Sequence, residues 1–222
     1  MLKFYYCPAP NPAKVALLLE ELGTPYEMVP IDTRKGDQHQ ADFLKINPNA
    51  KTPAIEDDGV PVFDSTAILM YLAEKHGKFQ PADPKLRGPF LSWMMFVASG
   101  IGPYSGQAVH FTRVVTTEEY ATRRYKFEAK RHWSILDAHL AGKTWMIGDE
   151  YSILDMAVWG WGRAMPYVLG DEAAQFGNVT KLVETISKRP AAERTDKLKE
   201  QANFKQDMDD DAKRAMFPSL AA

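Results

Sequence analysis

Residues 47–72 read NPNAKTPAIEDDGVPVFDSTAILMYL, and this stretch decides the fold. Pro53 opens a short apolar run, and because proline has no N–H it is tolerated at the first residue of a strand. A proline in a tight polar turn is also where a cis peptide bond is expected. Such a bond would turn the backbone N–H and C=O of Thr52 outward, where an extended peptide can pair with them as an added strand.

The second half of the stretch predicts a hairpin followed by a helix. Residues 57–59, Asp-Asp-Gly, are a common hairpin turn signal between two short strand-like runs. Asp64 and Ser65 then open a helix with apolar positions at helical spacing. Ser65 is a good N-cap, and helix N-termini attract anions. The stretch thus offers an outward backbone edge, a helix end that attracts anions and a nearby acid. Together these features suit a short peptide that carries both a carboxylate and an ammonium group.

Two motifs within the stretch carry a family resemblance. Asn-Pro-x-x-Lys-x-Pro-Ala-Ile at residues 47–55 and Phe-Asp-Ser-x-Ala-Ile-Leu-x-Tyr-Leu at residues 63–72 together resemble the glutathione site of a glutathione transferase. The resemblance implies that Thr52, before a cis Pro53, pairs with the cysteinyl backbone of glutathione. It also implies that the pair Asp64–Ser65 holds the γ-glutamyl group. At this spacing the two motifs are strongly specific together, although either alone would be weak.

The composition is that of an ordinary globular chain. The 222 residues are 45% hydrophobic and 25% charged with a net charge of −2, which indicates neither nucleic acid nor an anionic membrane as a partner. No apolar run approaches the ~18 residues of a membrane span, and no secretion signal is visible. The single cysteine, Cys7, forbids an internal disulfide framework and fits a reducing compartment. We therefore expect a cytoplasmic protein.

The order of predicted elements indicates an α/β domain followed by an all-α domain. Residues 1–77 read as strand, helix, strand, short helix, hairpin and helix, which matches an N-terminal thioredoxin-like domain. Residues 78–84 contain two prolines and no periodic pattern, so they read as a linker. Helical spacing then dominates residues 85–200, which predicts an all-helical C-terminal domain, and residues 201–222 form a tail. Within the second domain we expect helices at Leu86–Gly100, Glu118–Leu140, Ser152–Leu169 and Val179–Lys188.

The first helix follows a loop that contains three prolines. Asn11 stands directly before Pro12, the favoured order of N-cap and first helical residue, so the helix should run from about Pro12 to Leu22 and stop at Gly23. A site for a peptide thiol must lower a thiol pKa that is normally near ~8.5, and a donor or helix dipole aimed at the sulfur does so. The side-chain amide or backbone N–H of Asn11 can donate in this way. A plain N-cap is an equally good explanation on physical grounds.

The loop also resembles a particular class of transferase. Pro-x-Pro-Asn-x-x-Lys-Val at residues 8–15 is similar to the active-site loop of nu-class glutathione transferases, a mostly bacterial class associated with glutathione disulfide chemistry. The resemblance implies that Asn11 orients the sulfur. That class commonly has a threonine where this chain has Ala9, so one expected donor to the sulfur is missing.

The same resemblance implies further contacts with glutathione. Gln38 falls where nu-class members have a glutamine that reaches the glycyl end, and Lys51 can pair with the terminal carboxylate. Arg131 matches an arginine that contacts bound glutathione. The alternatives are a polar loop, a solvated lysine and an ordinary helix surface. His132 should point roughly 100° away from Arg131 at ~3.6 residues per turn, so the two side chains cannot face the site equally.

A glycine-broken segment at residues 102–111 is like the one that lines the second-substrate site in this class. Tyr104, Gln107 and Phe111 could provide an apolar pocket with a few polar groups, and His110 lies in the same segment. A kinked helix is the alternative interpretation.

Cys7 and Tyr6 each leave two interpretations open. Cys7 invites an omega-like mechanism with a mixed disulfide between protein and glutathione, but four residues before Asn11 it also fits a small buried hydrophobe. Tyr6 stands where several classical transferases carry a catalytic tyrosine, although packing within a strand explains it better.

The resemblance covers nearly the whole chain and implies a homodimeric enzyme that uses glutathione as a co-substrate. The expected reaction is glutathione-dependent disulfide reduction, conjugation of glutathione to a small electrophile, or both. A non-catalytic glutathione carrier, favoured by Ala9, and glutathione-dependent cleavage of an aromatic ether are the alternatives. The five histidines do not pair with a cysteine at ligand spacing, so we expect no metal.

Overall fold

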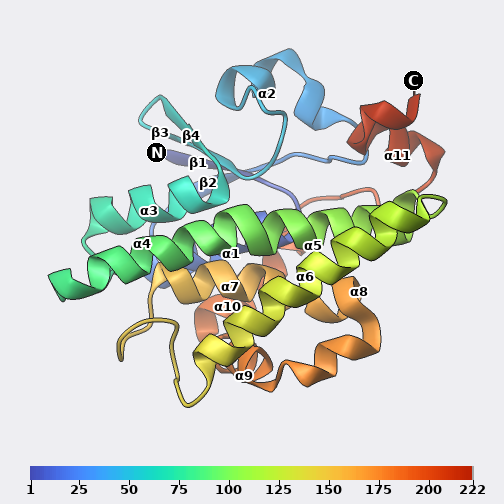
Figure 1. Ribbon diagram of the computed structural model, residues 1–222. Helices are drawn as coiled ribbons and strands as arrows, with labels where there is room; N and C mark the ends of the chain where they lie inside the picture. Colours follow the sequence, from blue (N-terminus) through green and yellow to red (C-terminus); the bar gives the residue numbers. More distant parts are fainter. Residues whose placement is uncertain (222) are drawn as a thin grey trace. The chain divides into compact units, whose positions relative to one another are not determined.

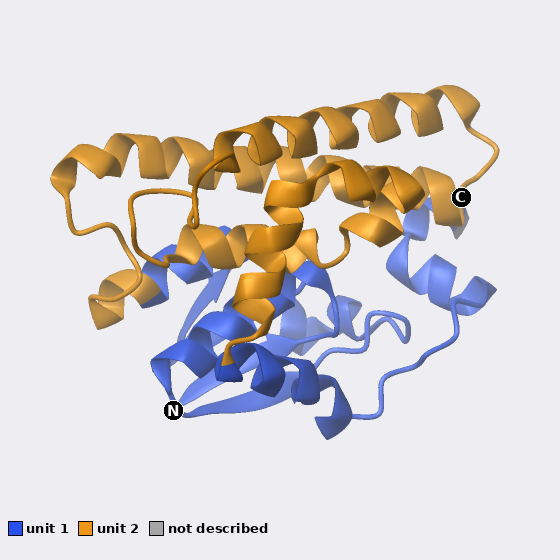
Figure 2. Ribbon diagram, turned by 90° about the horizontal axis from the view of Figure 1, so that it is seen from below, with its two compact units in different colours: residues 1–72, 190–222 blue, residues 73–189 orange. Residues whose placement is uncertain are grey.

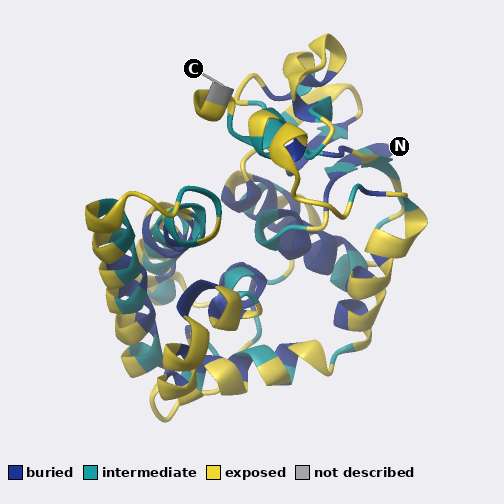
Figure 3. Cartoon of the chain, turned by 90° about the vertical axis from the view of Figure 1, so that its right-hand side faces the viewer, coloured by how far each residue is buried: buried dark blue, intermediate teal, exposed yellow. Residues whose placement is uncertain are grey.

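The computed structural model describes residues 1–221, so the last residue of the predicted tail lies outside it. The chain forms two compact units, one of residues 1–72 and 190–222 and the other of residues 73–189 (Figure 2). These units differ from the domain ranges expected from the sequence, because residues 190–222 join the first unit. Figure 3 colours the chain by burial: α6 has buried and exposed residues along its length, whereas residues 153–160 of α7 are all buried.

The first unit contains a four-stranded sheet in the order β2-β1-β3-β4. Its strands are β1 (Leu2–Tyr6), β2 (Tyr26–Pro30), β3 (Ala54–Asp57) and β4 (Val60–Phe63). β1 pairs in parallel with β2 and antiparallel with β3, which pairs antiparallel with β4. The parallel pair needs a crossover, supplied by α1 (Pro10–Leu22), whereas β3 and β4 join through a turn in which Asp58 and Gly59 both have positive φ. This mixed sheet with its helices is the predicted thioredoxin-like domain.

α1 ends as predicted but begins earlier than predicted. Gly23 closes the helix in the left-handed conformation with φ 66°. At the other end Ala9 is the N-cap and Pro10 the first helical residue, so the expectation that Asn11 is the N-cap was wrong. The fixed φ of proline suits the first helical position, and Pro10 reaches that position before Pro12 does. Asn11 is therefore the second residue of the helix.

Two further helices belong to this unit; the first contacts β3 and β4, and the second carries most of the motif at residues 63–72. They are α2 (Ala41–Ile46) and α3 (Ser65–His76). Phe4, at the centre of β1, lies opposite Met28 of β2 and Ile55 of β3, and both Phe4 and Ile55 are fully buried. The core of this unit thus forms along the middle of the sheet.

The C-terminal residues of the first unit contain two helices that the sequence analysis did not predict. They are α10 (Pro190–Lys197) and α11 (Asp210–Met216). α10 packs on α1, where the Arg194 Nε donates to the Glu20 Oε2 at 2.6 Å. Further on, the Arg34 Nη1 donates to the backbone oxygens of Lys205 at 2.8 Å and Gln206 at 2.6 Å. The predicted tail is thus fastened to the first unit.

The second unit is helical throughout its regular elements. The helices are α4 (Arg87–Phe96), α5 (Gly102–Val109), α6 (Glu119–Leu140), α7 (Ile153–Gly162), α8 (Met165–Leu169) and α9 (Gly177–Ser187). π-helical turns at Val97–Ile101 and His110–Val114 flank α5, and α6 runs alongside it (Figure 1). Ser152 and Asp155 form a capping box at the start of α7. Over the described residues, we find no helix with the length and apolar character needed to cross a bilayer.

Candidate functional site

The loop before β3 has the backbone geometry expected from the sequence. The Thr52–Pro53 peptide bond is cis, as predicted. The paired stretch of β3 begins at Ala54, which lies opposite Tyr5 of β1 and Phe63 of β4. The main-chain groups of Thr52 therefore lie just outside the sheet ladder, where an extended peptide can pair with them.

Cys7 contacts the side chain of Thr52. The Cys7 Sγ lies 2.9 Å from the Thr52 Oγ1, and the cysteine is only 6% exposed. Burial raises the pKa of the Cys7 thiol to about 11, although the hydrogen bond with Thr52 acts in the opposite direction. A thiol that is protonated at neutral pH is a poor nucleophile. Cys7 thus has the environment of a buried packing residue.

Asp64, and not Ser65, caps α3. The Asp64 Oδ1 accepts hydrogen bonds from the backbone N–H groups of Thr66 at 2.8 Å and Ala67 at 3.1 Å. Asp64 has φ 72°, a left-handed conformation that aspartate tolerates better than most residues. Ser65 is buried as the first helical residue, so the prediction that it is the N-cap was wrong. The cap needs only one oxygen of the exposed Asp64 carboxylate.

The start of α1 offers few backbone donors because of its prolines. Pro10 and Pro12 have no N–H, and the Ala13 N–H donates to the Ala9 oxygen at 3.1 Å. Asn11 is therefore the only one of the first three helical residues that carries a backbone N–H, and it adds a side-chain amide. Any donation from this helix end to a bound thiolate has to come from Asn11.

Lys14, one turn further along α1, is a buried charge that sequence reasoning missed. It is only 2% exposed, and burial lowers its pKa to about 8, while the negative charge of Asp64 acts in the opposite direction. The sequence feature that could have revealed this buried charge is a lysine between Ala13 and Val15 on an otherwise apolar stretch of helix. Lys14 places positive charge in the interior between α1 and Asp64.

Gln38 lies against the C-terminal helix α11. Its side chain is 4% exposed, and the Nε2 donates to the Ala215 backbone oxygen at 2.9 Å. His39 Nε2 lies 3.0 Å from the same oxygen. The Gln38 Oε1 is buried without a hydrogen-bond partner among the described residues. Lys51 differs from Gln38 in being exposed, so its ammonium group is accessible to a ligand.

In the second unit Arg131 is held by neighbours on α6. The Arg131 Nε donates to the Glu128 Oε2 at 2.9 Å, and the Arg124 Nη1 donates to the Glu128 Oε1 at 2.5 Å. These two arginines are the main reason that the Glu128 pKa is lowered. Sequence reasoning missed Glu128, although Arg124, Glu128 and Arg131 stand at the four- and three-residue spacings that favour helical ion pairs.

The predicted second-substrate residues meet around Tyr125, which sequence reasoning also missed. The Phe111 and Tyr125 rings stack with centroids 5.3 Å apart, and the Tyr104 and Tyr125 centroids are 6.3 Å apart. Gln107 is exposed on the same helix as Tyr104. The structure thus brings Tyr104 and Phe111 to one aromatic residue of α6.

Known proteins match the chain over both units. Residues 1–74 match the glutathione S-transferase N-terminal domain, and residues 93–190 match the glutathione S-transferase C-terminal domain. The chain is also 38% identical over 199 residues to the disulfide-bond oxidoreductase YfcG of Escherichia coli, a match that covers 86% of this chain and 92% of that protein. This chain belongs to the glutathione S-transferase family.

Solved transferases share the fold of this family member. A glutathione transferase from Pseudomonas putida, with one glutathione disulfide bound per subunit, matches with a TM-score of 0.83 at 37% identity, covering 89% of this chain and 91% of that chain. A transferase from Burkholderia graminis, with two glutathione molecules bound per subunit, matches with a TM-score of 0.83 at 35% identity, covering 90% and 89%. The α/β plus all-α fold class is thereby confirmed.

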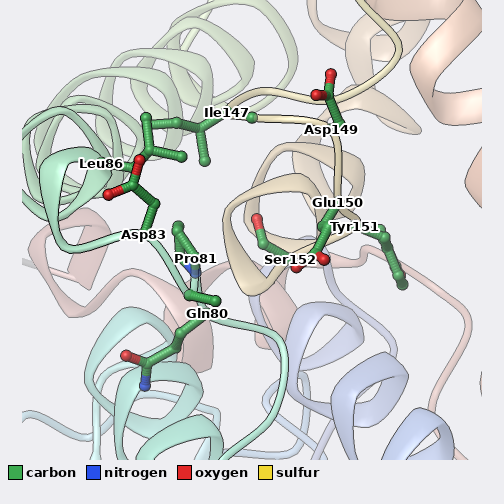
Figure 4. Close-up of a pocket in the computed structure, with 11 residues that line it drawn as sticks. Gln80, Pro81, Asp83, Leu86, Ile147, Asp149, Glu150, Tyr151 and Ser152 are labelled. Atoms are coloured by element: carbon green, nitrogen blue, oxygen red, sulfur yellow. The ribbon is translucent and has the colours of Figure 1, made fainter.

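A separate cavity of the transferase lies within the second unit. It has a volume of about 360 Å³ and is lined by residues 80–83, Leu86 and residues 147–152 (Figure 4). None of the predicted glutathione or second-substrate residues lines it. Between residues 1 and 221, no group of three or more His, Cys, Asp and Glu side chains is arranged to hold a metal ion.

Proposed function

We propose that this transferase binds glutathione and uses it to reduce disulfides, to conjugate small electrophiles, or both. The observation that carries the proposal is the main chain of Thr52 beside cis Pro53, in a chain 38% identical to a disulfide-bond oxidoreductase. The main chain of Thr52, just outside the sheet ladder, and the Asp64-capped helix start supply the two kinds of contact that a tripeptide with charged ends requires.

Each part of glutathione has a proposed contact. Thr52, beside cis Pro53, pairs with the cysteinyl backbone, and Asp64 with Ser65 holds the ammonium and carboxylate of the γ-glutamyl group. Asn11 donates to the sulfur. The remaining contacts proposed for the tripeptide are made by Gln38, Lys51 and Arg131. Tyr104, Gln107 and Phe111 contribute to the second-substrate pocket, supported by the Phe111–Tyr125 stack.

In disulfide reduction the redox work is done by the glutathione sulfurs. One glutathione thiolate attacks a sulfur of the substrate disulfide, which releases one thiol and leaves a mixed disulfide. A second glutathione thiolate attacks that mixed disulfide, releasing the second thiol and forming glutathione disulfide. Two protons pass from the two glutathiones to the two released thiols. No protein cysteine is needed, which agrees with the raised pKa of Cys7.

The Asn11→Ala variant tests this mechanism at the sulfur. Removing one preorganised donor from a developing charge should lower kcat by about 10²-fold, because Asn11 is the donor that the first turn of α1 supplies. The measurement is turnover with a model disulfide and with a model electrophile at saturating glutathione. Asn49→Ala, on the exposed turn before Thr52, is the matched control. An unchanged turnover in Asn11→Ala would remove the Asn11 side-chain amide from the mechanism.

A non-catalytic glutathione carrier is the second candidate. Ala9 favours it, since the N-cap of α1 has no side-chain hydroxyl to donate to the sulfur. Tight glutathione binding by calorimetry with neither activity would support the carrier, whereas turnover in either assay would exclude it. Glutathione-dependent cleavage of an aromatic ether is a third and narrower candidate. We also propose that the protein is a homodimer, which sedimentation tests. Its proposed location is the reducing cytoplasm.

A further inference from the structure

The guanidinium of Arg131 is held from two sides. Its Nε donates to the Glu128 Oε2 at 2.9 Å, and its Nη2 lies 3.3 Å from the His132 Nε2. These contacts use the Nε hydrogen and one Nη2 hydrogen. Among residues 1–221 we find no contact to the edge formed by Nη1 and the second Nη2 hydrogen, and such an edge binds a carboxylate with two parallel hydrogen bonds. Because the Arg131 side chain is 45% exposed, a ligand in solvent can reach it.

His132 contributes to this support as a hydrogen-bond acceptor. The His132 Nδ1 lies 2.7 Å from the Glu128 backbone oxygen, which can only accept, so Nδ1 carries the hydrogen. In the neutral ring Nε2 then has a lone pair for the Arg131 N–H. His132 is only 6% exposed, so it does not compete with Arg131 for a ligand that arrives from solvent.

The position of the His132 ring depends on Gly100. A Cβ at residue 100 would lie 2.4 Å from the His132 Cδ2 and 2.7 Å from the Nε2, which is too close for any real contact. Tyr104 stacks on the ring with centroids 4.7 Å apart at 27°. Gly100 lies in the π-helical turn Val97–Ile101, so the missing side chain in that turn makes room for the imidazole.

We propose that Gly100, His132 and Glu128 are positioning residues that orient Arg131 toward a carboxylate of glutathione. The inference rests on the proposed function, in which Arg131 contacts glutathione. The His132 imidazole and the buried Glu128 carboxylate fix one edge of the Arg131 guanidinium, and the other edge binds the ligand carboxylate. Glu128 and His132 act through Arg131 and do not touch the tripeptide.

Gly100→Ala tests this positioning of Arg131 without altering any residue that is proposed to bind glutathione. The new methyl group displaces the imidazole, so the dissociation constant and KM for glutathione should rise about tenfold, the value of one charge-assisted hydrogen bond, while kcat changes less than twofold. Gly88→Ala is the matched control, because a Cβ at residue 88 meets nothing within 4 Å. Binding is measured by calorimetry and KM by the disulfide reductase assay.

A double-mutant cycle separates positioning from a general structural effect. Arg131→Ala should weaken binding by a similar factor, and adding Gly100→Ala to it should weaken binding no further, since the guanidinium to be positioned is gone. Should Gly100→Ala not fold, Glu128→Gln replaces it in the cycle. Its control is Glu119→Gln, an acid on the same helix whose partner Arg123 is exposed.

Three outcomes overturn the inference. The first is normal glutathione binding by Gly100→Ala or Glu128→Gln, and the second is normal binding by Arg131→Ala. The third is full additivity in the double variant, which would show a structural effect unrelated to Arg131. If the wild-type protein itself bound no glutathione, the proposed function would fail and this inference with it, a result that the wild-type titration alone identifies.

Discussion

At the scale of single residues, burial shifts the pKa values of Cys7 and Lys14 in opposite directions. Burial disfavours the charged form of any group, so it raises the pKa of the Cys7 thiol to about 11 and lowers that of Lys14 to about 8. Residue type and spacing located the motif residues Thr52, Pro53 and Asp64. They could not reveal these environments, because the surroundings of Cys7 and Lys14 are set by residues distant in sequence.

Cys7→Ser should keep most of the disulfide reductase activity. The protonated thiol takes no part in exchange between glutathiones, and a serine hydroxyl can still bond the Thr52 hydroxyl across the 2.9 Å contact. The measurement is kcat/KM for a model disulfide, with circular dichroism as the control for folding. Loss of activity in a folded variant would point to a protein cysteine as the nucleophile.

Lys14→Met should alter the pH dependence of stability. The folded-state pKa of about 8 lies below the ordinary 10.5, so the unfolded chain binds more protons than the folded one between these values, and wild-type stability rises with pH across that window. Below pH 8 the cost of burying the charge is fully present, up to about 3 kcal/mol. Methionine removes that cost, so the variant should be more stable than wild type at pH 7.

Urea denaturation at pH 7 and pH 10 measures this difference. The advantage of Lys14→Met should shrink at the higher pH, whereas Lys78→Met, which alters an exposed lysine, should show no difference at either pH. An advantage that does not change with pH would contradict the assignment of the cost to the Lys14 charge.

At the scale of elements, the strands and long helices were predictable, but several ends were not. The hairpin turn at Asp58–Gly59 and the stop at Gly23 follow from positive φ, which few residues adopt. The start of α1 was misplaced because two prolines two residues apart both suit a first turn. The π-helical turns beside α5 left no distinct sequence signal, and α11 is too short to be favoured by its own sequence.

Ser152→Ala tests the capping box that opens α7. The Ser152 hydroxyl accepts from the Leu154 N–H at 3.3 Å and donates to the Asp155 Oδ2 at 2.9 Å, and both residues are buried. Its loss should lower the free energy of unfolding by about 1–2 kcal/mol. Urea denaturation measures the change. Ser92→Ala, an exposed serine on α4, should cost much less; equal costs would argue against the cap.

At the scale of the whole molecule, the C-terminal segment is attached through contacts that no local pattern encodes. Arg34 bonds to backbone oxygens of Lys205 and Gln206, positions separated from it by 171 and 172 residues. The Asp32 Oδ2 accepts from the Lys205 N–H at 2.7 Å. Every residue has a backbone oxygen, so residue type does not show which oxygen will accept a hydrogen bond. Sequence reasoning could therefore place Gln38 in a binding loop but not against Ala215.

Arg34→Met should loosen this attachment. Losing two hydrogen bonds at 2.8 and 2.6 Å should speed amide hydrogen exchange over residues 203–216 by about tenfold or more, with the sheet unaffected. Mass spectrometry of exchanged peptides measures it. Lys35→Met, which removes a longer 3.4 Å bond to the Asn203 oxygen, is the control and should have a smaller effect. Equal rates in wild type and Arg34→Met would show that other contacts hold the segment.

The packing of α10 and α11 in the first unit also has a consequence for how the protein is made. Domains usually fold in order as the ribosome releases them, beginning at the N-terminus. Here residues 1–72 emerge first, yet the partners of α1 and of the loop after β2 lie in residues 190–222. Residues 1–72 must therefore wait, incompletely covered, until residues 190–222 have also left the ribosome.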